Sequence, residues 1–167
     1  MKNVFLVNGN FRLSTLLLSL LAVALAGMIG ALFSIHAPTV YSNLMLPSFA
    51  PPSWVFAVVW PVLYVLMAVA AYRIRMLALP GKESAAVHAA LSDYIVQLVF
   101  NVLWSALFFG FGLRTAAFAD IIILLFYIAV TTIRFYRLDK TAGWLMVPYL
   151  IWVIFAAILN LAVLILN

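Results

Sequence analysis

Charged residues are missing from two long stretches of this chain, and their absence constrains the fold more than any other feature. No Asp, Glu, Lys or Arg occurs in residues 13–72 or in residues 141–167. Hydrophobic residues make up 69% of the sequence and charged residues 8%, whereas about 25% of the residues in a soluble domain are charged. Disordered chains need the opposite balance, with low hydrophobicity and high charge. The sequence therefore predicts an integral membrane protein.

Apolar runs of about 20 residues form helices long enough to cross a hydrocarbon core roughly 30 Å thick. Five runs qualify, at residues 13–35, 54–72, 91–111, 116–133 and 142–166. They are too long and too uniformly apolar for the alternating strands of a barrel. We expect an all-α membrane protein in which residues 1–167 form a single domain, a bundle of five transmembrane helices. A cleavable signal peptide is the other interpretation of the N-terminus, but the first run exceeds the usual apolar length of about 7 to 15 residues.

Basic residues are distributed unequally between the two sides of such a bundle. Of the nine, only Arg114 falls in the third loop, and the first loop has none. The other eight fall in the N-terminus and in the second and fourth loops: Lys2, Arg12, Arg73, Arg75, Lys82, Arg134, Arg137 and Lys140. The positive-inside rule then places the N-terminus in the cytoplasm and the C-terminus outside. Long apolar helices favour a bacterial inner membrane.

Several function classes are poorly supported. The net charge of +5 is spread over separate segments, which indicates contact with anionic lipid and not with nucleic acid. The chain has no cysteine, so disulfides and thiolate chemistry are excluded. His36 and His88 are expected at opposite membrane surfaces, so they cannot share a metal site. The acidic residues are scattered, and no hydrolytic triad is recognisable.

Polar and aromatic residues recur at helical spacing inside three of the runs, where they are expected to face protein or a cavity. The first stripe is Trp60, Tyr64, Met67 and Ala71; the second is Asp93, Gln97, Asn101, Trp104 and Phe108; the third is Tyr149, Trp152, Ala156 and Asn160. Trp54 and Trp144, each at the start of a run, are typical interfacial anchors.

Depth suggests that the three stripes share one site. At about 1.5 Å per residue, Trp60, Trp104 and Asn160 each lie roughly 10 Å below the outer end of their helix. The uncharged first loop, with four prolines between residues 36 and 53, is expected to be a stiff lid over them. Aromatic walls with neutral donors suit a planar, largely apolar ligand. Ordinary packing between helices is the alternative for any single residue.

Asp120 is the one acid expected inside the fourth helix. A hydrogen-bonded structural role is the more ordinary interpretation, and a proton-coupling role is the alternative.

The chain resembles the translocator protein family, also called tryptophan-rich sensory proteins or TspO/MBR, in four separated motifs. The first is Pro51-Pro52-Ser53-Trp54-Val55-Phe56 with Val59-Trp60, Leu63-Tyr64 and Met67; the second is Gln97-Leu98, Asn101, Trp104 and Phe108-Phe109; the third is Asp120; the fourth is Pro148-Tyr149-Leu150, Trp152, Phe155-Ala156 and Leu159-Asn160.

The resemblance implies a five-helix bundle, usually a homodimer, that binds porphyrins and synthetic benzodiazepine-type ligands under the first loop. Together with the stripes it gives these candidate ligand-binding residues: Phe56, Trp60, Tyr64, Asn101, Trp104, Trp152, Ala156 and Leu159. We expect a receptor-like sensory or regulatory protein whose partners are a tetrapyrrole (porphyrin or haem) and the bilayer, with no required cofactor and no metal site.

Two other functions remain open. One is transport of porphyrin or another apolar solute, and the other is light-dependent porphyrin breakdown that uses Trp60 and Trp152. The family often has Lys or Arg at the position of Leu46. The absence of that cation here removes a partner for a porphyrin propionate. Residues 161–167 lack the Tyr and basic residue of the cholesterol-associated pattern, so sterol binding by that motif is unsupported.

Overall fold

A computed structural model describes residues 4–78 and 85–167 of the chain. Lys2 and Lys82, both assigned to the basic side, lie outside these residues. The described chain is helical apart from short connections and one isolated bridge. Its helices are α1 Leu13–Phe33, α2 Ala37–Ser42, α3 Trp54–Leu77, α4 Ala85–Ser105, a π-helical turn Ala106–Gly110, α5 Arg114–Leu138 and α6 Lys140–Leu166.

Five of these helices are long and apolar enough to cross a membrane, with α4 and the π-helical turn forming one span. The all-α membrane bundle is therefore confirmed. The helices form where apolar runs leave the backbone no polar partner in lipid except itself. At the start of α6, Asp139 adds a cap by accepting a hydrogen bond of 2.8 Å from the Ala142 N–H.

Several helix ends differ from the sequence-based ranges. α3 continues to Leu77 and not to residue 72, α4 begins at Ala85 and not at residue 91, and α5 continues to Leu138 and not to residue 133. Arg73 and Arg75, expected in a loop, lie in the last turns of α3. The ends predicted from the apolar runs fall short of the observed ones, because charged residues at a membrane surface can continue a helix beyond its apolar part.

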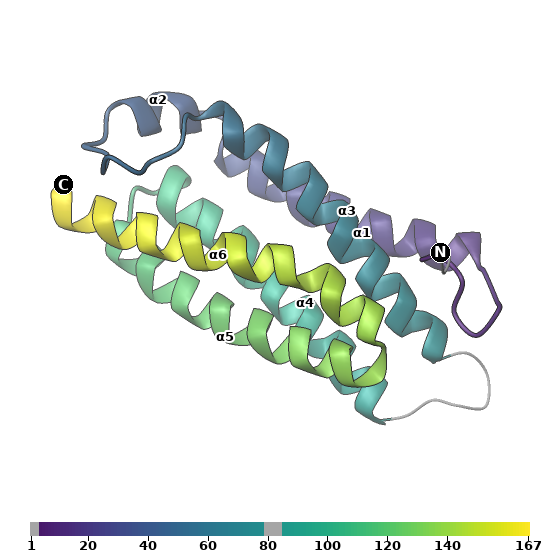
Figure 1. Cartoon of the computed structure of the whole chain (residues 1–167). Coiled ribbons are helices and arrows are strands. Elements are labelled where there is room, and N and C mark those ends of the chain that lie inside the picture. Colours follow the sequence, from purple (N-terminus) through teal and green to yellow (C-terminus); the bar gives the residue numbers. More distant parts are fainter. Residues whose placement is uncertain (1–3, 79–84) are drawn as a thin grey trace.

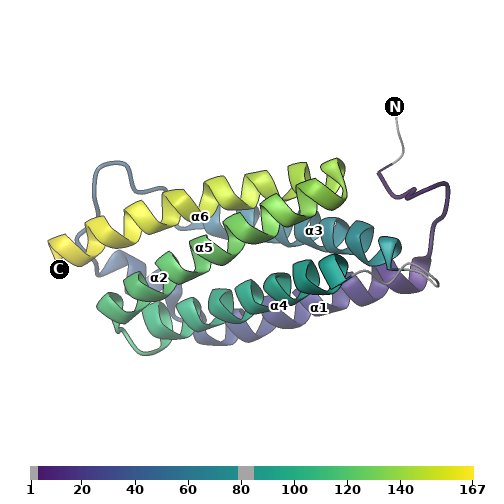
Figure 2. The same cartoon turned by 90° about the horizontal axis from the view of Figure 1, so that it is seen from below.

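The helices surround one core in the spatial order α1, α3, α6, α5, α4, and α4 packs against α1 to complete the ring. Figure 1 and Figure 2 show this elongated bundle, with the two termini at opposite ends. Small residues allow the helices to approach closely. A Cβ atom added to Gly143 of α6 would lie 2.5 Å from the Tyr136 Cα of α5.

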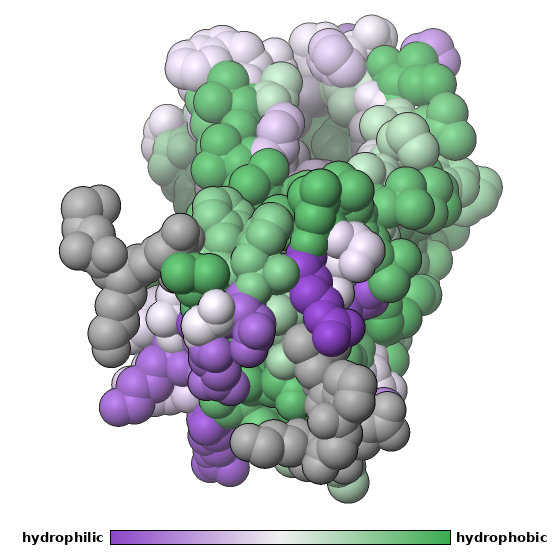
Figure 3. Space-filling model, turned by 90° about the vertical axis from the view of Figure 1, so that its right-hand side faces the viewer, coloured by the Kyte–Doolittle hydropathy of each residue, from purple (hydrophilic) through white to green (hydrophobic). Residues whose placement is uncertain are grey.

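We call the end of the bundle that holds the start of α1 and the end of α3 the basic end. Described basic residues gather here, including Arg75, Arg134, Arg137 and Lys140. Figure 3 looks onto this end and shows hydrophilic side chains collected on it, next to strongly hydrophobic flanks. We call the opposite end the lid end. It carries α2, the turn before α5 and the end of α6.

The N-terminal segment folds onto the basic end, which the sequence did not lead us to expect. Val7 and Asn10 exchange two backbone hydrogen bonds of 3.0 Å. Between them Asn8 and Gly9 have φ values of 50° and 77°, as in the Asn-Gly turns that favour positive φ. The Val7 side chain is buried against Tyr72 and Met76 of α3. The turn therefore covers the basic end of α3.

Burial along α3 changes from one half to the other. Residues 67–74 are all buried, whereas none of residues 54–61 is. The tight part of the core therefore lies toward the basic end. Toward the lid end, Phe56 and Trp60 are only half-buried.

Candidate ligand-binding site

Aromatic and polar side chains from α3, α4 and α6 meet in the lid half of the bundle. We call this set the aromatic layer: Phe56, Trp60 and Tyr64 of α3, Asn101 and Trp104 of α4, and Tyr149, Trp152, Phe155, Ala156, Leu159 and Asn160 of α6. Each of these residues is buried or half-buried. Members of all three stripes expected from the sequence therefore face the same interior region.

Asn101 joins three helices at the inner boundary of the layer. Its side-chain Oδ1 accepts a hydrogen bond of 3.1 Å from the Tyr64 hydroxyl, and its Nδ2 donates one of 3.2 Å to the Tyr149 hydroxyl. Asn101 is 3% exposed, so these bonds satisfy polar groups that would be costly to leave unpaired. The amide thereby fixes the positions of both tyrosine rings.

Trp60 lies beside these two tyrosines. Its ring centroid is 5.5 Å from that of Tyr64 and 6.3 Å from that of Tyr149. These separations are typical of favourable aromatic contacts. One face of the layer is thus formed by three rings from two helices.

The second part of the layer lies under the lid, residues 34–53. The Phe56 ring packs edge-on against Trp152 at 5.7 Å and against Tyr41 of α2 at 5.6 Å. The Tyr41 hydroxyl donates a hydrogen bond of 2.8 Å to the Pro51 carbonyl, and burial raises the pKa of that hydroxyl. This bond ties α2 to the segment that enters α3.

Trp104 connects α4 to α6 within the same region. Its indole Nε1 donates a hydrogen bond of 3.0 Å to Asn160 Oδ1. Its ring also stacks on Phe108 of the π-helical turn, with centroids 5.1 Å apart. π-Helical turns are frequent at functional sites. The expectation that Trp104 and Asn160 lie at the same depth is met.

Two donors in the layer have no partner among the described residues. They are Trp152 Nε1 and Asn160 Nδ2, and both atoms are buried. A buried donor without an acceptor costs about 1–3 kcal/mol. A ligand that brings an acceptor would recover this energy.

The structure positions all eight candidate residues on inward-facing sides of three helices, and their role in binding stays a prediction. The candidate set omitted three members of the layer. Tyr149 and Asn160 were on the stripe of the last helix, and Phe155 was in a family motif. The hydrogen bonds from Asn101 to Tyr149 and from Trp104 to Asn160 join residues 48 and 56 positions apart. Residue spacing along one helix cannot reveal such contacts between helices. The Tyr41 contact from the lid was missed for the same reason.

Asp120 lies outside the layer, on the buried side of α5. It is 4% exposed, and neither carboxyl oxygen has a hydrogen-bond partner among the described residues. The hydrogen bond expected for a structural role is therefore not formed among the described residues. The proton-coupling role stays a prediction.

The two histidines lie at opposite ends of the bundle. His36 precedes α2 at the lid end and His88 lies in the first turn of α4 at the basic end. Within residues 4–78 and 85–167, no group of three His, Asp or Glu side chains could hold a metal ion. Asp93, expected on the interior stripe, pairs instead with Arg134 at 2.7 Å near the basic end.

Two hollows lie outside the aromatic layer. One of about 580 Å³ lies between α1 and α4 and is lined by apolar side chains such as Ala26, Leu98 and Val102. The other, of about 630 Å³, lies at the lid end between α5 and α6. Within the layer the rings contact one another directly, so the rings and lid must separate for a large ligand to enter.

Comparison with known proteins identifies the same family as the motifs. The family model described as the TspO/MBR family matches residues 18–166. A tryptophan-rich protein TspO from Chlorobaculum tepidum is 35% identical over 159 residues, which cover 95% of this chain and 99% of that protein.

Two further relatives extend the range of organisms. A tryptophan-rich sensory protein from Cereibacter sphaeroides is 41% identical over 127 residues, 76% of each chain. The human translocator protein is 33% identical over 145 residues, which cover 86% of this chain and 84% of that protein.

Proposed function

Because this chain belongs to the TspO/MBR family, we propose that it is a membrane sensor that binds a tetrapyrrole, porphyrin or haem, in the aromatic layer. The sensory role is suggested by the name of the relative from Cereibacter sphaeroides, a tryptophan-rich sensory protein. The tetrapyrrole is suggested by the family resemblance and by the chemistry of the layer.

The ring arrangement supports a flat ligand. Trp60, Tyr64 and Tyr149 present ring faces and edges at 5.5–6.3 Å centroid separations, and Phe56 and Trp152 lie nearer the lid. Indole and phenol rings offer large apolar area with few rotatable bonds, and they stack well on a conjugated macrocycle. A planar ligand would insert between these groups after the Phe56–Trp152 contact opens.

The unpaired donors are the observation that carries the proposal. Trp152 Nε1 and Asn160 Nδ2 are buried without acceptors within residues 4–78 and 85–167, and a porphyrin offers acceptors in its carboxylates. The lid has Leu46 at the position where the family often has a cation. Neutral donors inside the layer would therefore replace an ion pair at the lid, which predicts weak dependence of binding on salt.

A Soret-band titration of purified protein with protoporphyrin IX tests this proposal. We expect saturable binding that weakens about tenfold in Trp152→Phe, because this change keeps an aromatic ring and removes only the donor. Trp144→Phe is the matched control, since Trp144 is 64% exposed at the basic end. Equal affinity in the two variants would contradict the role of the donor.

The charge distribution supports a cytoplasmic N-terminus. Apart from Arg114, every described Lys and Arg lies at the basic end, the end that the positive-inside rule orients inward. The chain has no cysteine, so single cysteines at the exposed residues Asn8 and Asn43 would report the two ends separately. In inner-membrane spheroplasts we expect an impermeant maleimide to label Asn43→Cys and not Asn8→Cys. The reverse pattern would overturn the orientation.

The homodimer, solute transport and light-dependent breakdown stay predictions. Sensing, transport and breakdown would all require a tetrapyrrole to bind in the aromatic layer. A tetrapyrrole that binds saturably but does not cross a proteoliposome membrane would favour sensing over transport.

A further inference from the structure

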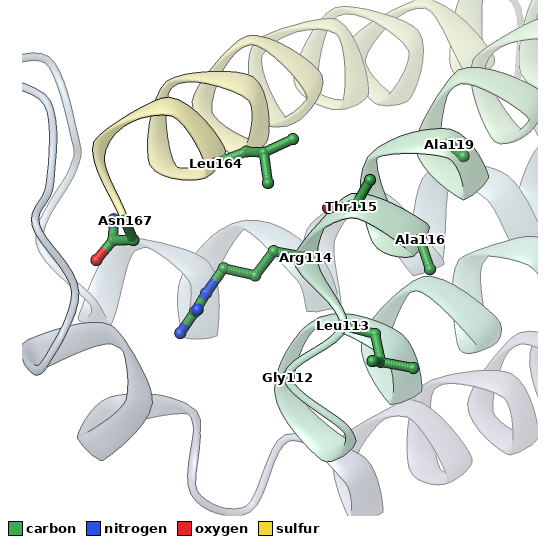
Figure 4. Close-up of a pocket in the computed structure, with 8 residues that line it drawn as sticks. All are labelled: Gly112, Leu113, Arg114, Thr115, Ala116, Ala119, Leu164 and Asn167. Carbon is green, nitrogen blue, oxygen red and sulfur yellow. The ribbon is translucent and has the colours of Figure 1, made fainter.

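The hollow of about 630 Å³ at the lid end contains a cation that the aromatic layer does not use. Arg114, the first residue of α5, lines this hollow. Figure 4 shows its side chain leaving the first turn of α5 and reaching beneath the last turn of α6, toward Asn167. Among the described residues it is the one Lys or Arg at the lid end.

Arg114 forms no salt bridge with any described residue. Its Nε is buried and lacks an acceptor among the described residues. Asp120, the acid on α5, has no hydrogen-bond partner among the described residues either, so the two side chains are not hydrogen-bonded to each other. A guanidinium presents planar N–H donors that match two oxygens of a carboxylate or phosphate. The unpaired guanidinium of Arg114 is therefore suited to bind two oxygens of such an anion.

The start of α5 adds neutral donors of the same polarity. No side chain caps this 25-residue helix, and its first turn has no acidic residue. The backbone N–H groups of Thr115 and Ala116 also have no acceptor among the described residues. A helix N-terminus carries about half a positive charge and attracts anions. Arg114, Thr115 and Ala116 all line the hollow, so side chain and backbone both favour an anion in it.

The rest of the lining is apolar, which distinguishes an amphiphile from a free ion. Leu113 and Leu164 flank the arginine, and Ala116 and Ala119 continue along α5 toward the membrane interior. Leu113 is 54% exposed, as expected for a side chain that contacts lipid. A phosphate at Arg114 would therefore have its acyl chains beside these apolar residues.

We propose that this hollow binds the phosphate of a phospholipid, with Arg114 donating to two phosphate oxygens and the start of α5 donating from its backbone. Such a headgroup at the lid end would neutralise the arginine that stands apart from the other cations. The site lies outside the aromatic layer, so it stands independently of tetrapyrrole binding.

Thermal unfolding of the full chain in maltoside micelles, followed by tryptophan fluorescence, measures this binding. Dioleoylphosphatidylglycerol is the probe, dioleoylglycerol supplies the same acyl chains without phosphate, and inorganic phosphate supplies the anion without chains. We expect the Tm to rise saturably with phosphatidylglycerol. Dioleoylglycerol and millimolar phosphate should each produce little shift.

Arg114→Gln should raise the apparent Kd for phosphatidylglycerol about tenfold, since it removes a charge-assisted contact. Arg114→Lys, which keeps the charge without the planar fork, should fall between that variant and the unaltered protein. Arg137→Gln, at an exposed arginine of the basic end, is the control and should leave the Kd unchanged. Circular dichroism checks that each variant is folded.

Three results would overturn the proposal. Equal Kd values in Arg114→Gln and Arg137→Gln would remove Arg114 from the site. An equal Tm rise with dioleoylglycerol would show that acyl chains bind without the phosphate. A rise with inorganic phosphate that matches phosphatidylglycerol and depends on Arg114 would make this a site for a free anion.

Discussion

The indole Nε1 of Trp104 donates a hydrogen bond of 3.0 Å to Asn160 Oδ1, and the Nδ2 of the same amide is buried without a partner in the part of the chain that the structure describes. One asparagine therefore has two roles. Its oxygen joins α6 to α4, and its nitrogen is one of the two donors that we propose hydrogen-bond the ligand.

Asn160→Leu separates these roles. The variant leaves Trp104 Nε1 buried without an acceptor, which should lower the free energy of unfolding by about 1–3 kcal/mol. Adding Trp104→Phe removes that donor and should recover part of the loss. Unfolding in detergent, measured for both single variants and the double variant, gives the coupling energy. Strictly additive losses would show that the bond contributes nothing specific.

Arg73 and Asp139 form the corresponding connection at the basic end. Arg73 Nε donates to Asp139 Oδ1 at 3.0 Å and Nη2 to Oδ2 at 2.7 Å, and Arg73 Nη1 donates to the Val4 carbonyl. The side chains are 10% and 12% exposed. Breaking a buried pair leaves an uncompensated charge, so Arg73→Gln should destabilise the protein by about 3 kcal/mol.

The same variant should release the N-terminal turn. Because Arg73 Nη1 also bonds the Leu6 carbonyl at 3.4 Å, we expect faster amide hydrogen exchange at Val7 and Asn10 in Arg73→Gln. Arg137→Gln, at an exposed arginine of the same end, should leave exchange unchanged. Unaltered protection of the Val7 and Asn10 amides from exchange in Arg73→Gln would show that Arg73 does not hold the N-terminal turn in place.

Acid should weaken this connection in a defined direction. Burial alone would raise the pKa of Asp139, but hydrogen bonds from Arg73 and from the Ala142 N–H, with the charge of Arg73, hold that pKa below its usual 3.8. A lowered folded-state pKa stabilises the protein fully above the unfolded value, and the contribution is lost as the pH falls through the folded value. The Tm should therefore decrease as the pH is lowered below about 4. The Asp139→Asn variant should lack this part of the decrease.

Gly143 tests the close approach of α5 and α6. A Cβ atom there would lie 2.5 Å from the Tyr136 Cα and 2.8 Å from its backbone nitrogen. Gly143→Ala should therefore force the helices apart and cost about 1–3 kcal/mol, despite the better helix propensity of alanine. Thr141→Ala, at an exposed position of the same turn, should unfold like the unaltered protein. A Gly143→Ala variant of unchanged stability would contradict the observed packing.

The five-helix bundle could be predicted from the sequence because lipid permits few structures for long apolar runs. Helix ends could not, since Arg73 and Arg75 continue α3 beyond the last apolar residue. Helical spacing predicted which sides of α3, α4 and α6 face inward. It could not show that Asn101 links Tyr64 to Tyr149, because that contact depends on how three helices pack. The turn at Asn8 and Gly9 was missed because the docking of the N-terminal segment depends on Tyr72 and Arg73, more than 60 positions away.

Indole NMR of the ¹⁵N-labelled protein in nanodiscs tests most directly the claim that a tetrapyrrole binds in the aromatic layer. The chain has five tryptophans. On titration with protoporphyrin IX, the Nε1–H signals of Trp152 and Trp60 should shift, and Trp152 should move downfield as it gains an acceptor. The signals of Trp54 and Trp144, which are 65% and 64% exposed, should stay in place. Saturating protoporphyrin that shifts only Trp54 or Trp144, or leaves Trp152 and Trp60 unchanged, would contradict the proposed site.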